Sequence, residues 1–566
     1  MIHRALRFLS AEVRGLQAAA YVLAGAALLS SVLALGRDRL LAHLFGAGPT
    51  LDLYYAAFRI PDLIFVGTGA LVSVYVLIPE LARRSDRQQK EYLDTIIGAF
   101  SLFACVVSGI AALLAPWLLT RLFPTIVTNG GLPDLVFLTR IILLQPIFLG
   151  LSNILAAVTQ SRNRYTLYSI SPLLYNFGII LGVGSFYKII GISGLAWGVA
   201  LGAALHVGVQ IPSLVSDGFL RSIPRIRDFS ALSTTVFISL PRALALSMNQ
   251  LAFLGLTALA GLLAPGSIAI FVLAYNLQAV PLSIIGASYS VAAFPTLAAA
   301  LSRGDTENFL VHIATAARYV FFWSFPATAL IITLRAYLVR VILGSGNFDW
   351  TDTRLTAAVF ALFSLSLVAQ GLSLLLIRGY YAAGRTFVPF FVSTLSALTT
   401  VFLGLICIAA LKVGAISITA RSIMRLQDVP GVEILGLGFA YAVVSIASAV
   451  FLSLHFEYRF KGFLRRISRS FLESMVAASA ALVAAYFVLY LIGPIAVGST
   501  TLSVFLKGFA AGTIGLIVAT LTYWILGSSE LHETVIAVRG RFFRSEFKQP
   551  AGVPVATANE ENPVQT

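Results

Sequence analysis

The sequence predicts an all-α polytopic membrane protein, and three observations indicate this fold class. Of its 566 residues, 58% are hydrophobic and only 11% are charged, whereas soluble globular proteins carry about 25% charged residues. The mean hydropathy is +0.90. Long apolar runs such as 440–454 do not alternate with polar residues as the strands of a membrane barrel do. Together these features exclude a soluble enzyme, a secreted domain and a disordered scaffold.

Fourteen apolar runs are long enough to cross a bilayer, because a spanning helix needs roughly 20 mainly apolar residues. The first run follows Arg4, Arg7 and Arg14 as a signal peptide would, but it is longer and lacks a clear cleavage site, so we expect a retained helix. The expected spans lie near 17–45, 52–81, 93–120, 135–159, 165–187, 192–215, 231–262, 267–296, 309–334, 356–382, 387–411, 434–455, 471–492 and 503–526.

The loops arrange these helices into units and orient them. Lysine and arginine are enriched in cytoplasmic loops, and the basic groups at 83–90 and 459–469 fall on the same side as the N-terminus if every span is counted. Both termini are therefore expected in the cytoplasm, and the net charge of +15 indicates contact with anionic membrane lipids rather than nucleic acid. The expected units are a cytoplasmic N-terminus (1–16), an N-lobe of six helices (17–216), a basic cytoplasmic linker (217–230), a C-lobe of six helices (231–456), a basic cytoplasmic loop (457–470), two extra helices (471–526) and a partly disordered cytoplasmic tail (527–566).

Two pairs of similar segments predict that the lobes are parallel repeats. The second and eighth spans end alike around Pro79 and Pro295, and the fifth and eleventh begin alike around Arg164 and Arg385. Six helices separate the members of each pair, so both copies have one orientation. Parallel repeats about an axis along the membrane normal are a transporter architecture with the substrate site between the halves. The alternative is that proline and basic residues are simply common at helix ends.

Polar side chains inside the spans are the candidate substrate-binding residues, because such groups usually face a cavity or a partner. Arginine suits phosphate, since its planar fork donates two hydrogen bonds and stays charged. Adjacent helical residues point about 100° apart, so Arg37 and Asp38 should face different neighbours. The alternatives are a structural ion pair near the outer interface for the charges and hydrogen bonds between helices for the amides. The candidates are Arg37, Asp38, Asp52, Arg59, Asn249, Gln250 and Asn276.

No motif for catalysis, nucleotide binding or metal binding occurs in the sequence. It has no nucleophile–base set, Walker loop, HExxH or CxxC, and its two cysteines, Cys105 and Cys407, are far apart. We therefore expect a transporter without catalytic residues, cofactor or metal. Transport would have to draw on a monovalent ion gradient, the membrane potential or substrate turnover.

The first two spans resemble those of the MurJ (MviN) lipid II flippases, in the multidrug/oligosaccharidyl-lipid/polysaccharide exporter superfamily. The similarity rests on 31–38, 44–48, Asp52, 57–61 and Pro79, and it continues in order as far as Arg385. The resemblance implies a bacterial plasma-membrane protein with two lobes around a central cavity. It also implies that alternating access carries a lipid-linked peptidoglycan precursor from the inner to the outer leaflet, and that helices thirteen and fourteen hold its polyprenyl tail.

Several arginines of that family are missing from this chain. Ser31, Phe65 and Asn276 stand where the resemblance leads one to expect arginine. Fewer bidentate donors weaken phosphate recognition unless other arginines compensate; the candidates for this are Arg140, Arg242 and Arg318. The cargo therefore stays open between lipid II and another lipid-linked saccharide or an amphipathic cation. A transport-inactive membrane scaffold of the same fold is the third hypothesis.

Overall fold

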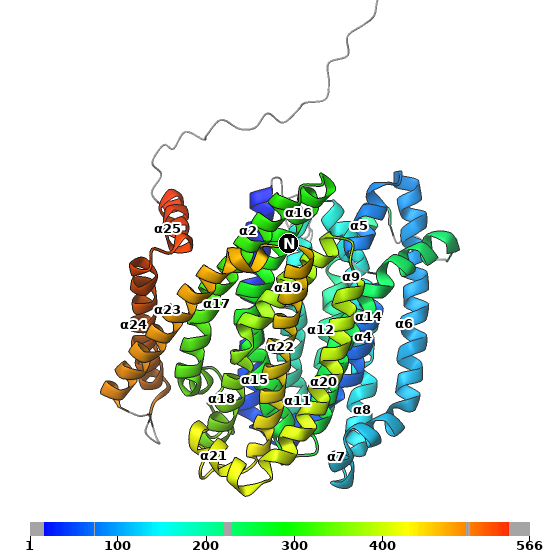
Figure 1. Cartoon of the computed structure of the whole chain (residues 1–566). Coiled ribbons are helices and arrows are strands. Elements are labelled where there is room, and N and C mark those ends of the chain that lie inside the picture. The colour runs from blue at the N-terminus through cyan, green and yellow to red at the C-terminus, as the bar shows by residue number, and fades with distance from the viewer. Residues whose placement is uncertain are drawn as a thin grey trace, which may run out of the picture.

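All regular elements that the structure describes are helices (Figure 1). The computed structural model describes residues 16–72, 74–162, 164–219, 226, 228–493, 495 and 499–542. The first half comprises α2 (Leu16–Phe45), α3 (Pro49–Ala57), α4 (Arg59–Leu71), α5 (Val74–Ala82), α6 (Asp86–Leu122), α7 (Pro124–Thr128), α8 (Leu132–Ile142), α9 (Leu144–Ser161), α10 (Tyr165–Leu181), the π-helical η1 (Gly182–Phe186), α11 (Tyr187–Ile190), α12 (Ser193–Gly208) and α13 (Ile211–Ser216).

The second half repeats this pattern of long helices with short breaks. It comprises α14 (Phe229–Ala260), α15 (Ser267–Leu282), the π-helical η2 (Ser283–Ala287), α16 (Ser288–Ser302), α17 (Thr306–Ile342), α18 (Trp350–Leu365), α19 (Leu367–Ala382), α20 (Phe387–Leu411), α21 (Gly414–Met424), the 3-10 turn η3 (Val432–Ile434), α22 (Leu435–Arg459), α23 (Phe463–Ile492), α24 (Thr501–Ile525) and α25 (Ser529–Phe542).

The all-α membrane fold is confirmed, whereas the count of fourteen spans is not. In the described residues, 11 helices are long and apolar enough to cross a membrane, or 12 if α18 and α19, bent by 42°, form one span. The two remaining predicted spans differ in form. The helix at 17–45 carries three charged residues at 37–39, and the run at 52–81 is divided into α3, α4 and α5.

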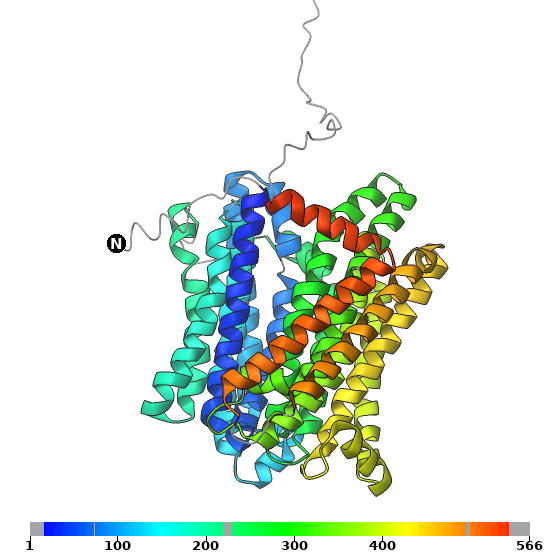
Figure 2. The same cartoon turned by 90° about the vertical axis from the view of Figure 1, so that its left-hand side faces the viewer.

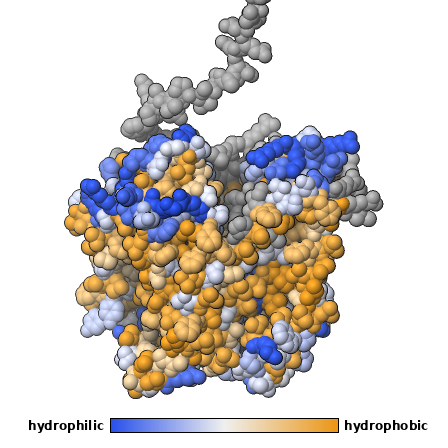
Figure 3. All heavy atoms as spheres, turned by 45° about the vertical axis from the view of Figure 1, so that its right-hand side comes forward, coloured by the Kyte–Doolittle hydropathy of each residue, from blue (hydrophilic) through white to orange (hydrophobic). Residues whose placement is uncertain are grey.

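The surface has the layering of a membrane protein. On the face shown in Figure 3, a broad apolar belt crosses the bundle, and hydrophilic residues gather at its two ends. We call these the α5 end, at the top of Figure 1, and the α21 end, at the bottom. Large apolar side chains such as Leu113 and Phe402 are exposed by 78% and 66%, as expected where acyl chains replace water.

Glycines allow α10 and α12 to pack with their backbones almost in contact. A Cβ atom built on Gly198 would lie 2.4 Å from the Cα of Gly182, and one built on Gly202 would lie 2.4 Å from the carbonyl oxygen of Tyr175. Small residues at such positions permit the close approach that membrane helices use in place of hydrophobic association. The predicted fifth and sixth spans are thus held together as one pair.

The halves of the chain contact each other at several places, among them the following two. The long helix α14 packs against both α4 and α20. The turn between α2 and α3 contacts the loop before α18: Gly46 has φ +61°, and a Cβ there would lie 2.6 Å from the carbonyl oxygen of Asn347. Glycine is required at this turn both for its left-handed conformation and for space.

The C-terminal helices lie at one side of the bundle. Helices α23 and α24 pack against each other and against α17, and α25 lies at the α5 end (Figures 1 and 2). Glu530 of α25 is 3% exposed and pairs with Arg318 of α17 at 3.3 Å. Within the predicted tail 527–566, the described residues thus contain a helix, α25, that is held against α17. Nearly all of the predicted segment 1–16, half of the linker 217–230 and the tail beyond 542 lie outside the described residues.

Candidate functional site

Arg37 and Asp38 form the centre of a polar network that joins three helices. The Arg37 Nε donates to Asp38 Oδ1 at 2.9 Å, and its Nη1 donates to Oδ1 of Asn176 on α10 at 3.2 Å. Asp38 accepts from Nδ2 of Asn276 on α15 at 2.9 Å. The two neighbours thus face different helices, as their helical spacing predicts. Asp38 is 3% exposed and the Arg37 side chain 19%, so this network is largely shielded from solvent.

Arg59 forms a second buried group next to the break between α3 and α4. Its Nε donates to the carbonyl oxygen of Tyr55 at 3.0 Å, and its Nη2 lies 3.6 Å from Oδ2 of Asp62. The guanidinium lies 4.8 Å from the ring centre of Phe253 on α14, a cation–π geometry. Arg59 therefore joins the predicted N-lobe to the first helix of the predicted C-lobe.

Asp52 lies apart from both groups and caps a helix. Its carboxylate accepts from the backbone nitrogens of Gly266 and Ala269 at 2.6 and 2.8 Å, at the start of α15. An anion here satisfies free amides and complements the positive end of the helix dipole. The structure thus gives Asp52 a local positioning role, linking α3 to α15.

Asn249 and Gln250 on α14 are not brought into either group. Asn249 is exposed and Gln250 half-buried. Asn276, the third predicted amide, donates its hydrogen bond to Asp38. This contact between side chains of two helices corresponds to the alternative that the sequence left open for amides.

Aromatic side chains continue from Arg59 into the second half of the bundle. Phe253 packs against Tyr275 with ring centres 4.5 Å apart, and Tyr275 contacts Phe363 and Tyr441 at 5.8 and 6.1 Å. The Tyr441 hydroxyl donates to Oε1 of Gln370 at 3.1 Å. Arg59 is thus followed by a cluster of packed aromatic rings, whose tyrosine hydroxyls are its polar groups.

Sequence reasoning did not include four residues of these groups among the candidates. Asn176 and Asp62 are polar residues within apolar runs, a signal that could have found them. Phe253 and Tyr275 give no such signal, because an aromatic residue in an apolar helix has no distinguishing pattern until its neighbour is known.

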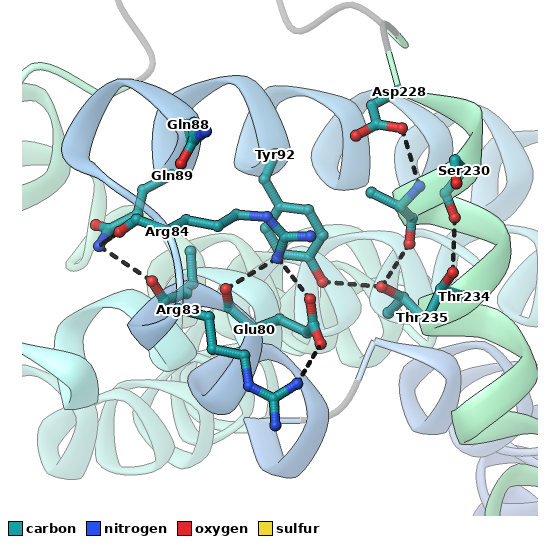
Figure 4. Close-up of polar contacts among 12 residues, drawn as sticks. Glu80, Arg83, Arg84, Gln88, Gln89, Tyr92, Asp228, Ser230, Thr234 and Thr235 are labelled. Carbon is teal, nitrogen blue, oxygen red and sulfur yellow. Dashed lines mark hydrogen bonds and ion pairs between the residues drawn. The ribbon is translucent and has the colours of Figure 1, made fainter.

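A further contact between the halves lies at the α5 end (Figure 4). The Tyr92 hydroxyl on α6 lies 2.9 Å from Oγ1 of Thr235 on α14, and both side chains are 2% exposed. Arg84 stacks on the Tyr92 ring at 4.0 Å and donates to Oε2 of Glu80 at 2.7 Å. We call Glu80, Arg84, Tyr92 and Thr235 the α5-end contact. It closes α6 against α14 on this side.

Two arginines suggested as substitutes for the missing ones are engaged elsewhere. Arg140 is exposed and donates to the carbonyl oxygen of Ala112 at 3.0 Å, and Arg318 pairs with Glu530. The side chain of Arg242 lies outside the described residues. The described cations of the central groups are therefore Arg37 and Arg59, each beside a carboxylate.

A bundle of apolar helices with buried, paired charges between its halves defines a class of protein: a polytopic helical membrane protein. Comparison with solved structures supports this fold. The chain is similar to "Lipid II flippase MurJ, inward closed conformation", with a TM-score of 0.69 and 20% identity, covering 89% of this chain and 99% of that one. It is also similar to an inward-facing multidrug resistance MATE family transporter of the MOP superfamily, with a TM-score of 0.62, 12% identity, and coverage of 77% and 96%.

The sequence comparisons identify the particular family. The family described as "Lipid II flippase MurJ" matches residues 41–506, and the chain belongs to this family. A curated relative, the "Lipid II flippase MurJ" of Burkholderia cenocepacia, is 26% identical over 374 residues, covering 63% of this chain and 72% of the relative. The family and the many apolar helices make this a multi-pass protein of the bacterial inner membrane.

Proposed function

We propose that this chain moves a polyprenyl-diphosphate-linked peptidoglycan precursor, lipid II, from the inner to the outer leaflet by alternating access. Family membership supports the class of cargo. The observation that carries the proposal within the molecule is the Arg37–Asp38 network with Asn176 and Asn276, which places a charged group where α2, α10 and α15 meet.

The physical argument concerns the headgroup. Moving a diphosphate through hydrocarbon without a partner costs several kcal/mol or more, so the protein must offer cations along the route. Arg37 and Arg59 are held close to acids that an incoming diphosphate would displace. The exchange of one anion for another keeps each guanidinium paired, so the resting state contains no unpaired buried arginine.

Alternating access requires the two halves to separate at one end at a time. In the proposed cycle, the α5-end contact opens to admit the headgroup from the cytoplasm and closes before the α21 end opens. Both termini are proposed to be cytoplasmic, which puts the α5 end and its basic loops on the inner side. An ion gradient or the membrane potential is the proposed energy source.

A second candidate is a transporter of the same fold that moves another lipid-linked saccharide or an amphipathic cation. The pairing of each central arginine with a carboxylate favours it, because Arg37–Asp38 and Arg59–Asp62 each have a formal net charge of zero. A neutral, aromatic-lined path is less selective for a diphosphate than a cluster of unpaired arginines.

The deciding experiment is replacement of a bacterium's own lipid II flippase by this chain. We expect growth and outer-leaflet lipid II to recover when the chain is expressed, and to be lost again with Arg37→Ala or Arg59→Ala. The matched control is Arg140→Ala, which removes an exposed arginine that is hydrogen-bonded to α6 and belongs to neither group.

Each outcome decides between the candidates. Correct insertion of the chain without recovery of lipid II in the outer leaflet would reject lipid II as the cargo. If lipid II in the outer leaflet also recovers with both arginine variants, lipid II stays supported as the cargo and the proposed site is rejected. If Arg140→Ala is the only variant that does not restore growth, the arginine that binds the substrate lies on α8 instead.

A further inference from the structure

A cavity at the α21 end lies outside the central groups and has its own chemistry. Its volume is about 780 Å³, and it is bounded by the ends of α17, α18, α21 and α23. Helix α23 leans outward from the other helices on this side (Figure 1). The cavity thus faces the membrane near one interface, and it is separate from the Arg37 and Arg59 groups, none of whose residues line it.

Three arginines line this cavity, and only one of them has an acidic partner in the described residues. Arg354 pairs with both oxygens of Asp428, each at 2.9 Å. This guanidinium also lowers the pKa of the Asp428 carboxyl below its usual value, so the pair stays ionised. Arg335 donates instead to the carbonyl oxygen of Ile332 at 2.9 Å, and Arg425 donates to the Tyr486 hydroxyl at 3.1 Å.

Arg335 and Arg425 are the two positive charges of the cavity that lack an acidic partner in the described residues. Arg335 is half-buried, Arg425 is exposed, and both side chains line the same cavity. Arg425 also holds a left-handed backbone conformation with φ 60° at the end of α21, which is uncommon for a residue with a side chain. Two like charges directed into one cavity repel, and an anion that contacts both would remove this repulsion.

The other walls of the cavity are apolar and aromatic. Trp350, Tyr337 and Leu489 line it, and Tyr490 at its edge is 74% exposed. Tryptophan and tyrosine are typical of the membrane interface, where a ring contacts both chains and headgroups. A ligand of this cavity should therefore combine a phosphate with hydrocarbon chains.

We propose that this cavity is a binding site for an anionic membrane phospholipid, whose phosphate bridges Arg335 and Arg425 and whose acyl chains lie along α23. Charge complementarity selects the headgroup, since arginine donates two hydrogen bonds to phosphate oxygens. The surrounding bilayer supplies the ligand at high local concentration. The site goes beyond transport and does not depend on the identity of the cargo.

Native mass spectrometry of the full chain can test this site. The protein is reconstituted in nanodiscs of phosphatidylcholine with or without phosphatidylglycerol, then released and weighed with its retained lipids. We expect one retained phosphatidylglycerol in the wild type and at least about a tenfold lower retained fraction in Arg335→Gln/Arg425→Gln, because two charge-assisted hydrogen bonds are lost. The control Arg121→Gln/Lys412→Gln removes two exposed cations that do not line the cavity and should retain the lipid.

Competition separates the membrane lipid from other sources of phosphate. Inorganic phosphate and a polyprenyl diphosphate are added to the phosphatidylglycerol nanodiscs. Retention that neither compound reduces supports a phospholipid site. Displacement by millimolar inorganic phosphate, or selective retention of the polyprenyl diphosphate, would overturn it in favour of a free-anion site or a cargo site. Equal retention in the wild type and the Arg335→Gln/Arg425→Gln variant would overturn it as well.

Discussion

At the residue scale, Asp52 is the candidate whose surroundings are most specific. Both of its oxygens accept backbone N–H groups at the start of α15, so it acts as a cap supplied by another helix. Its position in a sequence that resembles a transport family indicates substrate contact, whereas its hydrogen bonds indicate stability. A substitution of Asp52 would lower the transport rate if Asp52 contacts substrate, and the thermal stability if it caps α15.

Asp52→Ala should lower the thermal unfolding midpoint, because losing a helix cap costs about 0.5–2 kcal/mol. Asp52→Asn keeps one acceptor oxygen and should lose less. Both are measured by thermal unfolding in detergent beside the transport assay, scaled to the folded fraction. An Asp52→Ala protein of wild-type stability that fails to transport would instead assign Asp52 to the transport path.

The Arg37–Asp38 pair allows a double-mutant cycle. Arg37→Gln leaves the buried carboxylate of Asp38 without its cation, which should destabilise the protein by about 3–5 kcal/mol. Asp38→Asn alone should cost less, since Arg37 keeps the oxygen of Asn176 as a partner. The double variant should recover most of the loss in thermal stability. Losses that simply add in the double variant would mean that the two side chains do not interact.

The sequence predicted part of the candidate site, and the remainder follows from packing. Arg37 and Asp38 were predicted as parts of one charged site and Asn276 as an embedded amide elsewhere, and the structure joins the three. Asn249 was predicted on the same grounds and is exposed on α14. A polar residue in an apolar run shows that a partner is needed, but the rotation of the helix decides which partner it meets. That rotation depends on contacts made across the whole bundle.

At the element scale, the α10–α12 pair depends on the absence of side chains. Gly198→Ala would put a Cβ 2.4 Å from the Cα of Gly182, so the helices must move apart, at a cost of about 1–3 kcal/mol. Gly208→Ala in the same helix meets nothing within 4 Å and should be neutral or slightly stabilising. Thermal unfolding of both variants tests this. Equal midpoints would show that the close approach is not needed for stability.

The α5-end contact gives a prediction about opening. Thr235→Val removes the hydroxyl that meets Tyr92, and the loss of about 1 kcal/mol should raise the open population roughly fivefold. The readout is maleimide labelling of Ser239→Cys, at a position 1% exposed one turn further along α14, with Cys105 and Cys407 replaced by alanine.

Thr234→Val is the matched control for this opening. Thr234 is exposed, and its hydroxyl donates to the carbonyl oxygen of Ser230 within the same helix. Its labelling rate should equal that of the parent protein. A labelling rate unchanged in Thr235→Val would mean that Tyr92 and Thr235 meet without holding α6 against α14.

The sequence predicts the long helices, but it does not predict where a span is broken into shorter helices. Apolar length predicted the long helices because the bilayer imposes it. The division of 52–81 into α3, α4 and α5 was not predicted, since no proline or glycine interrupts the chain at Phe58, between α3 and α4. The break is stabilised by tertiary contacts, among them Asp52 with α15 and Arg59 with Phe253. Such contacts leave no local pattern.

At the scale of the whole molecule, the distribution of basic residues predicts how the bundle is oriented in the membrane. The structure places basic residues at both ends of the bundle. The α5 end carries the basic loop beginning at Arg83, and the α21 end carries the phospholipid cavity proposed above with Arg335 and Arg425. Each cation near an anionic leaflet surface is worth about 1 kcal/mol. The proposed orientation therefore rests on the larger basic surplus at the α5 end, and it places the proposed lipid site in the outer leaflet.

Cysteine labelling in intact cells tests this orientation. Lys188→Cys, exposed at the α21 end, should react with a membrane-impermeant maleimide added from outside, in the background without Cys105 and Cys407. Arg303→Cys, exposed in the loop between α16 and α17 at the α5 end, should react only after the inner membrane is permeabilised. The reverse pattern would place the α5-end contact outside. The direction of transport would then have to be derived anew, because the inner opening would lie at the α21 end.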